Sequence, residues 1–169
     1  MRDYLLDTNI WSDWYNPKKN DYILRYLENA PDIKFHISAV TWGELRYGYD
    51  VLTQRGKRQL GNIWEFVRGL APKTIQIDKH VARDYGRIRA RLFEKYAPKE
   101  RRRRGLRPEQ LIDPVTSLQL GIQENDLWIA SQAITRDLVL VTNDIKSMRP
   151  LREVAGNDLI VETWAGETA

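Results

Sequence analysis

The segment that most constrains the fold lies close to the N-terminus. An apolar run at residues 4–6 ends abruptly in Asp7, Thr8 and Asn9, and an apolar, tryptophan-rich segment follows at once. This pattern is typical of a buried parallel strand whose carboxyl end opens into a crevice just before a helix begins. Ligands bind at that edge of open α/β sheets. Asp7 is therefore either a ligand-binding residue or simply the cap of the next helix.

The same alternation of strand and helix patterns continues along the chain. Further strands are predicted at residues 33–37, 74–77, 138–141 and 159–161. Helices are predicted at about 9–15, from Asp21, at 38–53, at 60–70, after Asp78 and from near Asp126. Strands separated by helices favour an α/β sandwich with a mostly parallel central sheet. At 169 residues the chain is about one domain long, so we assign residues 1–169 to a single domain.

One stretch differs in composition from the rest. We expect a basic insertion at about residues 97–120, exposed over residues 97–111, rather than a domain boundary, and the apolar core pattern resumes at residues 118–122. Its four consecutive arginines could bind RNA phosphates, bind an acidic segment of a partner, or simply be solvated; they are Arg101, Arg102, Arg103 and Arg104. The formal net charge of +4 and the sequence pI of about 9.3 also favour an anionic partner, nucleic acid before membrane.

The composition excludes several classes of protein. With no cysteine, the chain has neither disulfides nor thiolate metal sites, which fits a reducing cytoplasm. No apolar run approaches the roughly 20 residues that span a bilayer, and the N-terminus lacks a signal-peptide pattern, so we expect a soluble cytoplasmic protein with no membrane partner. The only histidines, His36 and His80, form no obvious acid–base pair, which argues against a metal-free ribonuclease.

Four acidic residues occupy equivalent places in this pattern. Asp7 and Asp144 directly follow strands, Glu44 lies early in the helix after the strand at 33–37, and Asp126 opens the helix before the strand at 138–141. In a parallel sheet these side chains could converge at one edge. Converged carboxylates repel one another unless a cation neutralises them, and oxygen-only ligands select Mg²⁺ or Mn²⁺. Such ions activate water and stabilise the leaving oxygen of a phosphodiester, which points to a metal-dependent nuclease.

Each of these acids also has a purely structural interpretation. The order Thr41-Trp-Gly-Glu44 fits a capping box, in which Glu44 would accept a hydrogen bond from the Thr41 N–H and have no other role. Asp126 and Asp144 could both be helix or turn caps. The residues alone leave both interpretations open.

Four motifs in order carry a resemblance to a known family. They are Leu-Leu-Asp7-Thr8-Asn9-Ile, Ile-Ser-Ala-Val-Thr41-Trp-Gly-Glu44-Leu-Arg-Tyr-Gly48, Glu124-Asn125-Asp126-Leu-Trp-Ile-Ala130 and Leu-Val-Thr142-Asn143-Asp144. Together they resemble the PIN-domain family, and more closely the VapC-type toxins of bacterial toxin–antitoxin pairs. The resemblance runs nearly end to end. It implies a PIN-like α/β/α sandwich, a Mg²⁺- or Mn²⁺-dependent endoribonuclease acting on RNA, a homodimer and a cognate antitoxin.

The resemblance also assigns roles to particular positions. The family's metal-binding acids match Asp7, Glu44, Asp126 and Asp144. The polar residues that support them, by orienting ligands or water, match Thr8, Asn9, Thr142 and Asn143. Two departures are a longer, more basic 97–120 segment and the pair Ser147-Met148, where many relatives have Phe.

Two other functions stay open on the sequence. In the first, the same acids are caps and the protein is a non-catalytic binding or assembly module. In the second, the protein is a DNase with a similar site.

Overall fold

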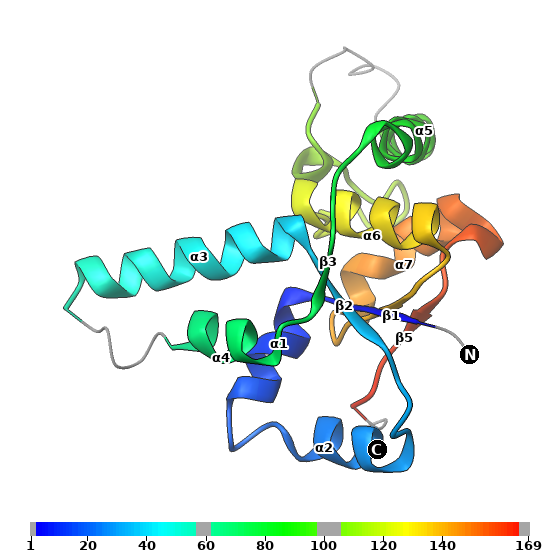
Figure 1. The fold of residues 1–169 in the computed structure, drawn as a ribbon. Coiled ribbons are helices and arrows are strands. Elements are labelled where there is room, and N and C mark those ends of the chain that lie inside the picture. Colours follow the sequence, from blue (N-terminus) through cyan, green and yellow to red (C-terminus); the bar gives the residue numbers. More distant parts are fainter. Residues whose placement is uncertain (1–2, 57–61, 98–105, 166–169) are drawn as a thin grey trace.

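A computed structural model of the protein describes residues 3–56, 62–97 and 106–165 (Figure 1). Its centre is a parallel sheet with the strand order β3-β2-β1-β4-β5. The strands are β1 (Tyr4–Leu6), β2 (Phe35–Ser38), β3 (Lys73–Ile75), β4 (Val139–Val141) and β5 (Val161–Glu162). In the register of the sheet, Leu6 lies opposite Ile37 on one side and Val141 on the other. The carboxyl ends of β1, β2 and β4 therefore lie next to one another.

Helices cover both faces of this sheet. They are α1 (Thr8–Tyr15), α2 (Asp21–Asn29), α3 (Ala39–Gln54), α4 (Ile63–Leu70), α5 (Lys79–Tyr96), α6 (Glu124–Arg136) and α7 (Ile145–Ala155). Leu5 and Leu140 pack on one face with α5, α6 and α7, whereas Leu6 and Val141 pack on the other with α1 to α4. Figure 1 shows the resulting three layers, with α3 extending outward beyond the sheet. The predicted α/β/α sandwich with a parallel sheet is confirmed.

Short-range sequence signals account for most element boundaries. Asp7, Ser38 and Asp78 each accept a hydrogen bond from a backbone N–H in the first turn of α1, α3 and α5. The predicted strands are present, with ends shifted by one or two residues. Helix α7 was not predicted, because Pro150 lies inside it and removes one backbone donor. Its buried Met148 and Leu151 pack into the core and compensate for that loss.

The basic insertion is less exposed than predicted at its ends. Ala97 and Leu111 are buried in the core cluster with residues of α5, α6 and α7, so the expectation of an exposed segment is wrong for these positions. Leu120 is buried as the apolar pattern at residues 118–122 predicted, whereas Leu118 is exposed. The short 3-10 helix η3 (Pro108–Gln110) leads into this buried part. Arg101–Arg104 lie outside the described residues. Within the described ranges, every helix is too short or too polar to cross a membrane.

Candidate active site

The four predicted acids all line one open cleft of about 360 Å³ at the carboxyl edge of the sheet. Asp7 comes from the end of β1, Glu44 from α3, Asp126 from α6, and Asp144 from the turn between β4 and α7. The other residues that line the cleft are Thr8, Asn9, Ser12, Asp13 and Gln123. None of these described lining residues is Lys or Arg. The parallel register brings together residues that are up to 137 positions apart in the sequence, from Asp7 to Asp144.

Asp7 is the most firmly held of the four acids. Its side chain is buried, and its Oδ1 accepts a hydrogen bond from the Thr8 N–H at 2.7 Å. Its Oδ2 accepts one from the Asn9 Nδ2 and one from the Thr142 hydroxyl, each at 2.7 Å. Asn9 Nδ2 also lies 2.9 Å from Thr142 Oγ1. Asn9 and Thr142 thus join the ends of β1 and β4 around one carboxylate.

Glu44 is held by contacts across the cleft rather than by a capping box. Its Oε2 accepts a hydrogen bond from the Thr8 hydroxyl, and its Oε1 accepts one from Asn125 Nδ2 at 2.8 Å. The capping-box interpretation is wrong because α3 begins three residues earlier than that box requires. Ser38 is the N-cap, and its hydroxyl accepts a hydrogen bond from the Val40 N–H at 2.9 Å.

Asp126 and Asp144 do cap helices, as their structural interpretation proposed. Asp126 Oδ2 accepts a hydrogen bond from the Gln123 N–H at 2.8 Å, and Asp144 Oδ1 accepts one from the Ser147 N–H at 3.1 Å. Within the described residues, the second oxygen of each carboxylate has no hydrogen-bond donor from the protein. One oxygen can therefore cap a helix while the other stays available in the cleft, so the two interpretations are compatible.

The electrostatics of the cleft show that the four carboxylates interact. Burial raises the pKa of Asp7 above its ordinary value, and the charges of Glu44 and Asp144 raise it further, although Thr142 and Thr8 oppose the shift with hydrogen bonds. Burial raises the pKa of Asp126 to about 7, and repulsion from the other three acids adds to the effect. Near neutral pH, Asp126 therefore exchanges a proton in the absence of a cation.

The carboxylates share the cleft without forming a closed coordination shell. Over residues 3–56, 62–97 and 106–165, no group of three or more acidic, histidine or cysteine side chains could hold a metal ion as the side chains stand. Mutual repulsion and the capping bonds of Asp126 and Asp144 both work against closer approach.

The supporting residues divide into two groups. Thr8, Asn9 and Thr142 each donate a hydrogen bond directly to one of the four carboxylates. Asn143 does not, because its side chain turns toward α1 and α2. Its backbone N–H donates to Asn9 Oδ1 at 3.1 Å.

Three further residues contribute to this arrangement and were not predicted from the sequence. Asn125 donates to Glu44, and its place beside Asp126 in one of the four motifs was the signal that could have revealed it. Asp13 lines the cleft, and Tyr22 hydrogen-bonds to Asp13. Neither belongs to a recognisable motif, so only the structure identifies them.

The chain also matches a known protein family. A sequence model of the PIN domain matches residues 4–156, which include all four acids. The chain belongs to the PIN-domain family. PIN domains are generally nucleases, so membership places the protein in a nuclease family. None of the curated proteins compared with the chain matches it.

Several solved structures have the same fold as this PIN-domain protein. A chain in the crystal structure of VapBC2 from Rickettsia felis, bound to a DNA fragment from their promoter, is 28% identical with a TM-score of 0.65; the match covers 95% of this chain and 98% of that one. DNA-bound VapBC from Salmonella typhimurium is 23% identical over 97% and 99% of the two chains, with a TM-score of 0.64. FitAcB from Neisseria gonorrhoeae is 24% identical over 94% and 95%, with a TM-score of 0.61. The predicted resemblance to VapC-type toxins is confirmed.

Proposed function

We propose that this PIN-domain protein is a metal-dependent endoribonuclease and the toxin of a toxin–antitoxin pair. The observation that carries the proposal is the cleft in which Asp7, Glu44, Asp126 and Asp144 converge without a basic residue among the described lining residues. Holding like charges close together costs free energy, most of all for buried Asp7, so such a cluster is expected where a cation binds. The capping hydrogen bonds of Asp126 and Asp144 do not remove this repulsion, because both carboxylates still line the same cleft.

The donor set fits Mg²⁺ or Mn²⁺. All the candidate ligands are carboxylate oxygens, which hard divalent ions prefer, and neither cysteine nor histidine lines the cleft within the described residues. Asp7, Glu44, Asp126 and Asp144 would hold the ion, directly or through water, and the ion would draw them closer than they stand without it. When bound, the ion supplies Lewis acidity, which favours attack of water on a phosphodiester and stabilises the leaving oxygen.

The residues of the chain have distinct tasks in this proposal. Asp7 is already fixed by three hydrogen bonds and provides a rigid anchor. Asp126 and Asp144 each have one oxygen without a protein donor among the described residues. Each side chain would therefore need only a small rotation to contact a cation. Thr8 and Asn125 hold the Glu44 carboxylate between them. No side chain is required as a nucleophile, because water attacks.

RNA is the proposed substrate, and the net charge of +4 favours such an anionic partner. The matched solved structures are described as VapBC and FitAB-type complexes, and one is described as a toxin–antitoxin complex. By analogy we infer a cognate antitoxin, a homodimer and a cytoplasmic location for this chain. Arg101–Arg104 remain candidates for RNA contact. The alternatives are a DNase and a non-catalytic assembly module.

A cleavage assay tests the proposal. The purified protein is incubated with an RNA oligonucleotide and the DNA of the same sequence, with Mg²⁺, with Mn²⁺ and with a chelator. We expect cleavage of RNA only, and only with a metal ion. Asp126→Asn should abolish it, whereas the matched control Asp32→Asn should not, because exposed Asp32 precedes β2 at the opposite edge of the sheet.

Each alternative function gives a different result. Cleavage of the DNA instead would show a DNase. Unchanged RNA cleavage by Asp126→Asn would reject the assigned site, and the absence of any cleavage would favour an assembly module. In cells, expression of the chain should arrest growth, and Asp7→Ala should relieve the arrest.

A further inference from the structure

A second polar cluster lies beside the cleft and includes residues of α1, α2 and the β4–α7 turn. The Tyr22 hydroxyl on α2 donates to Asp13 Oδ2 on α1 at 2.9 Å. Asn143 Nδ2 donates to the same Asp13 oxygen at 2.9 Å and contacts the Tyr22 hydroxyl oxygen at 2.6 Å. The three side chains therefore satisfy one another in a closed triangle. We call Asp13, Tyr22 and Asn143 the α2 anchor.

Asn143 uses its side-chain amide and its backbone N–H to hold the turn that carries Asp144. Besides the two contacts of Nδ2, its Oδ1 accepts a hydrogen bond from the Thr163 hydroxyl at 3.2 Å, and its backbone N–H donates to Asn9 Oδ1 at 3.1 Å. The next residue is Asp144, whose N–H donates to Thr142 Oγ1 at 3.0 Å. Because these contacts fix Asn143, the position of the adjacent Asp144 carboxylate depends on where Asn143 is held.

The anchor also explains why an acid stands at the rim of a cleft that is already acidic. Asp13 lines the cleft, yet its Oδ2 is occupied by Tyr22 and Asn143. Its Oδ1 lies 3.7 Å from the ammonium of Lys19, which is largely exposed and therefore contributes little. Burial and the nearby Asp13 raise the pKa of Tyr22, so its hydroxyl stays protonated and remains a donor. Asp13 thus acts as an acceptor for the anchor.

We propose that Tyr22 is a positioning residue for the metal site: through Asp13 and Asn143 it sets where the Asp144 carboxylate stands relative to Asp7. This inference rests on the proposed function, since it concerns the ion that the four acids would hold. Residues one layer behind metal ligands typically influence metal affinity or activity by about 10-fold or more. Tyr22 reaches this layer from α2, which contributes no residue to the cleft lining described above.

The chain provides a matched control on the same helix. Tyr26 lies one turn further along α2, and its hydroxyl hydrogen-bonds to the Tyr4 hydroxyl at 3.1 Å, away from Asn143. Tyr22→Phe and Tyr26→Phe each remove a single hydroxyl from a partly buried ring of α2. Only Tyr22→Phe breaks the α2 anchor. A general effect on the stability of α2 would therefore appear in both variants, and an effect on Asp144 only in one.

The experiment is a Mn²⁺ titration of the full-length chain, followed by thermal unfolding and by RNA cleavage. We expect Tyr22→Phe to raise the Mn²⁺ concentration for half-maximal stabilisation about 10-fold, and Tyr26→Phe to leave it within about 2-fold of the wild type. Saturating Mn²⁺ should restore most of the cleavage rate of Tyr22→Phe. Should Tyr22→Phe unfold too early to titrate, Asn143→Ser, which removes the amide without altering α2, should show the same loss.

The outcomes separate this inference from the proposed function. If the wild type binds Mn²⁺ and cleaves RNA, but Tyr22→Phe titrates like the wild type or like Tyr26→Phe, the positioning role is overturned and the proposed function stands. If the wild type shows no stabilisation by Mn²⁺, both are overturned. A further loss on adding Tyr22→Phe to Asn143→Ala would also contradict the inference, because both changes break the same contact and should not add.

Discussion

Two buried aspartates in this molecule have the same exposure and opposite electrostatics. Asp84 on α5 and Asp7 at the end of β1 are each 5% exposed. Burial opposes ionisation of Asp84, but a 2.8 Å hydrogen bond from Thr135 and the guanidinium groups of Arg83 and Arg87 outweigh it, so its pKa is lowered. The pKa of Asp7 is raised by its burial and by neighbouring carboxylates.

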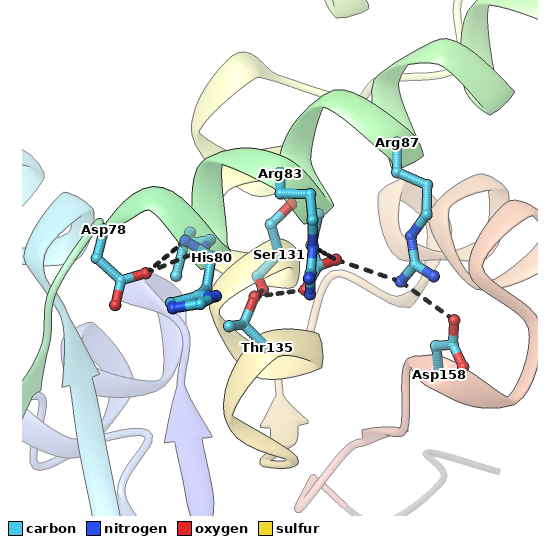
Figure 2. A network of polar contacts seen from close by, with 9 residues as sticks. Asp78, His80, Arg83, Arg87, Ser131, Thr135 and Asp158 are labelled. Carbon is cyan, nitrogen blue, oxygen red and sulfur yellow. Dashed lines mark hydrogen bonds and ion pairs between the residues drawn. The ribbon is translucent and has the colours of Figure 1, made fainter.

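Burial raises the pKa of both acids, and the comparison shows that their neighbours separate them: Asp84 has two arginines beside it, whereas Asp7 has carboxylates. Figure 2 shows the first region, in which Arg87 also reaches Asp158 at 3.2 Å and joins α5 to the short 3-10 helix η4 (Gly156–Asp158). That network contains its own cations and needs nothing further. The cleft around Asp7 has hydrogen-bond donors but no basic residue among the described lining residues, and the proposed cation would neutralise its charge.

The largest expected effect is on activity and comes from the cleft alone. Loss of a residue behind a metal ligand lowers activity by up to about 100-fold. Asp7 is itself a proposed ligand, so Asp7→Asn should lower RNA cleavage by more than about 100-fold. In a chelator, the same variant should unfold at a urea concentration no lower than the wild type, because it removes a repelled buried charge. A clear loss of metal-free stability would show that Asp7 is structural in the way that Asp84 is.

The second expected effect is on stability and not on activity. Asp84→Asn should lower the free energy of unfolding by about 2 kcal/mol, because it leaves the hydrogen bond from Thr135 weakened and two arginines without their buried partner. RNA cleavage by the folded variant should equal that of the wild type. Urea unfolding and initial cleavage rates measure the two quantities, and a loss of cleavage without a loss of stability would contradict the comparison.

The third effect is the pH dependence of stability without metal. The pKa of Asp126 rises from 3.8 to about 7 in the folded state. Between about pH 4 and pH 7 the folded protein therefore holds a proton on Asp126 that the unfolded chain has lost. Stability from this group is therefore greatest below about pH 4 and falls as the pH rises toward 7, by at most about 1.4 kcal/mol per pH unit. Asp84 has a lowered pKa, so its contribution is present above about pH 4 and is lost as the pH falls further.

Variants of Asp126 and Asp84 distinguish their contributions to the pH dependence of stability. Asp126→Asn should flatten the decline between pH 4 and 7 when unfolding is followed in a chelator. Asp84→Asn should instead reduce the loss of stability in acid. A profile of Asp126→Asn that overlays the wild type across pH 4–7 would rule out the assigned shift.

The smallest effect concerns a residue that holds one of the acids. Asn125→Ala removes one of the two donors to Glu44 and leaves Thr8 in place, so cleavage at limiting Mn²⁺ should fall about 5-fold. The control is Asn29→Ala, which removes an exposed asparagine amide that donates to the Arg25 carbonyl on α2. Equal cleavage rates for Asn125→Ala and Asn29→Ala would show that Asn125 has no role in the site.

Local sequence patterns predicted the elements that create the cleft. Buried β1 and β4 each end in a polar triplet, and their parallel pairing then places Asp7 and Asp144 at one edge of the sheet. Local patterns failed where a partner is remote. The capping box was inferred from Thr41 and Glu44, which are three residues apart, whereas the partners of Glu44 lie 36 and 81 positions away.

Two other features required the folded chain. Helix α7 has a proline in its interior, and only the burial of Met148 and Leu151 reveals that it forms. The α2 anchor joins Tyr22 to Asn143 across 121 positions, and neither residue has a periodic pattern that marks the contact. Asn143 could be selected from its motif, but the direction of its side chain could not.

The central claim is that the four carboxylates form a cation site and that an ion bound there displaces a proton from Asp126, whose pKa is raised to about 7. Calorimetric titration with Mn²⁺ at pH 6, in buffers of different ionisation enthalpy, measures the protons released per ion. We predict release of about one proton at pH 6, less at pH 8, and clearly less from Asp126→Asn at pH 6. Failure of Mn²⁺ to bind, or equal proton release from the wild type and Asp126→Asn, would contradict the claim.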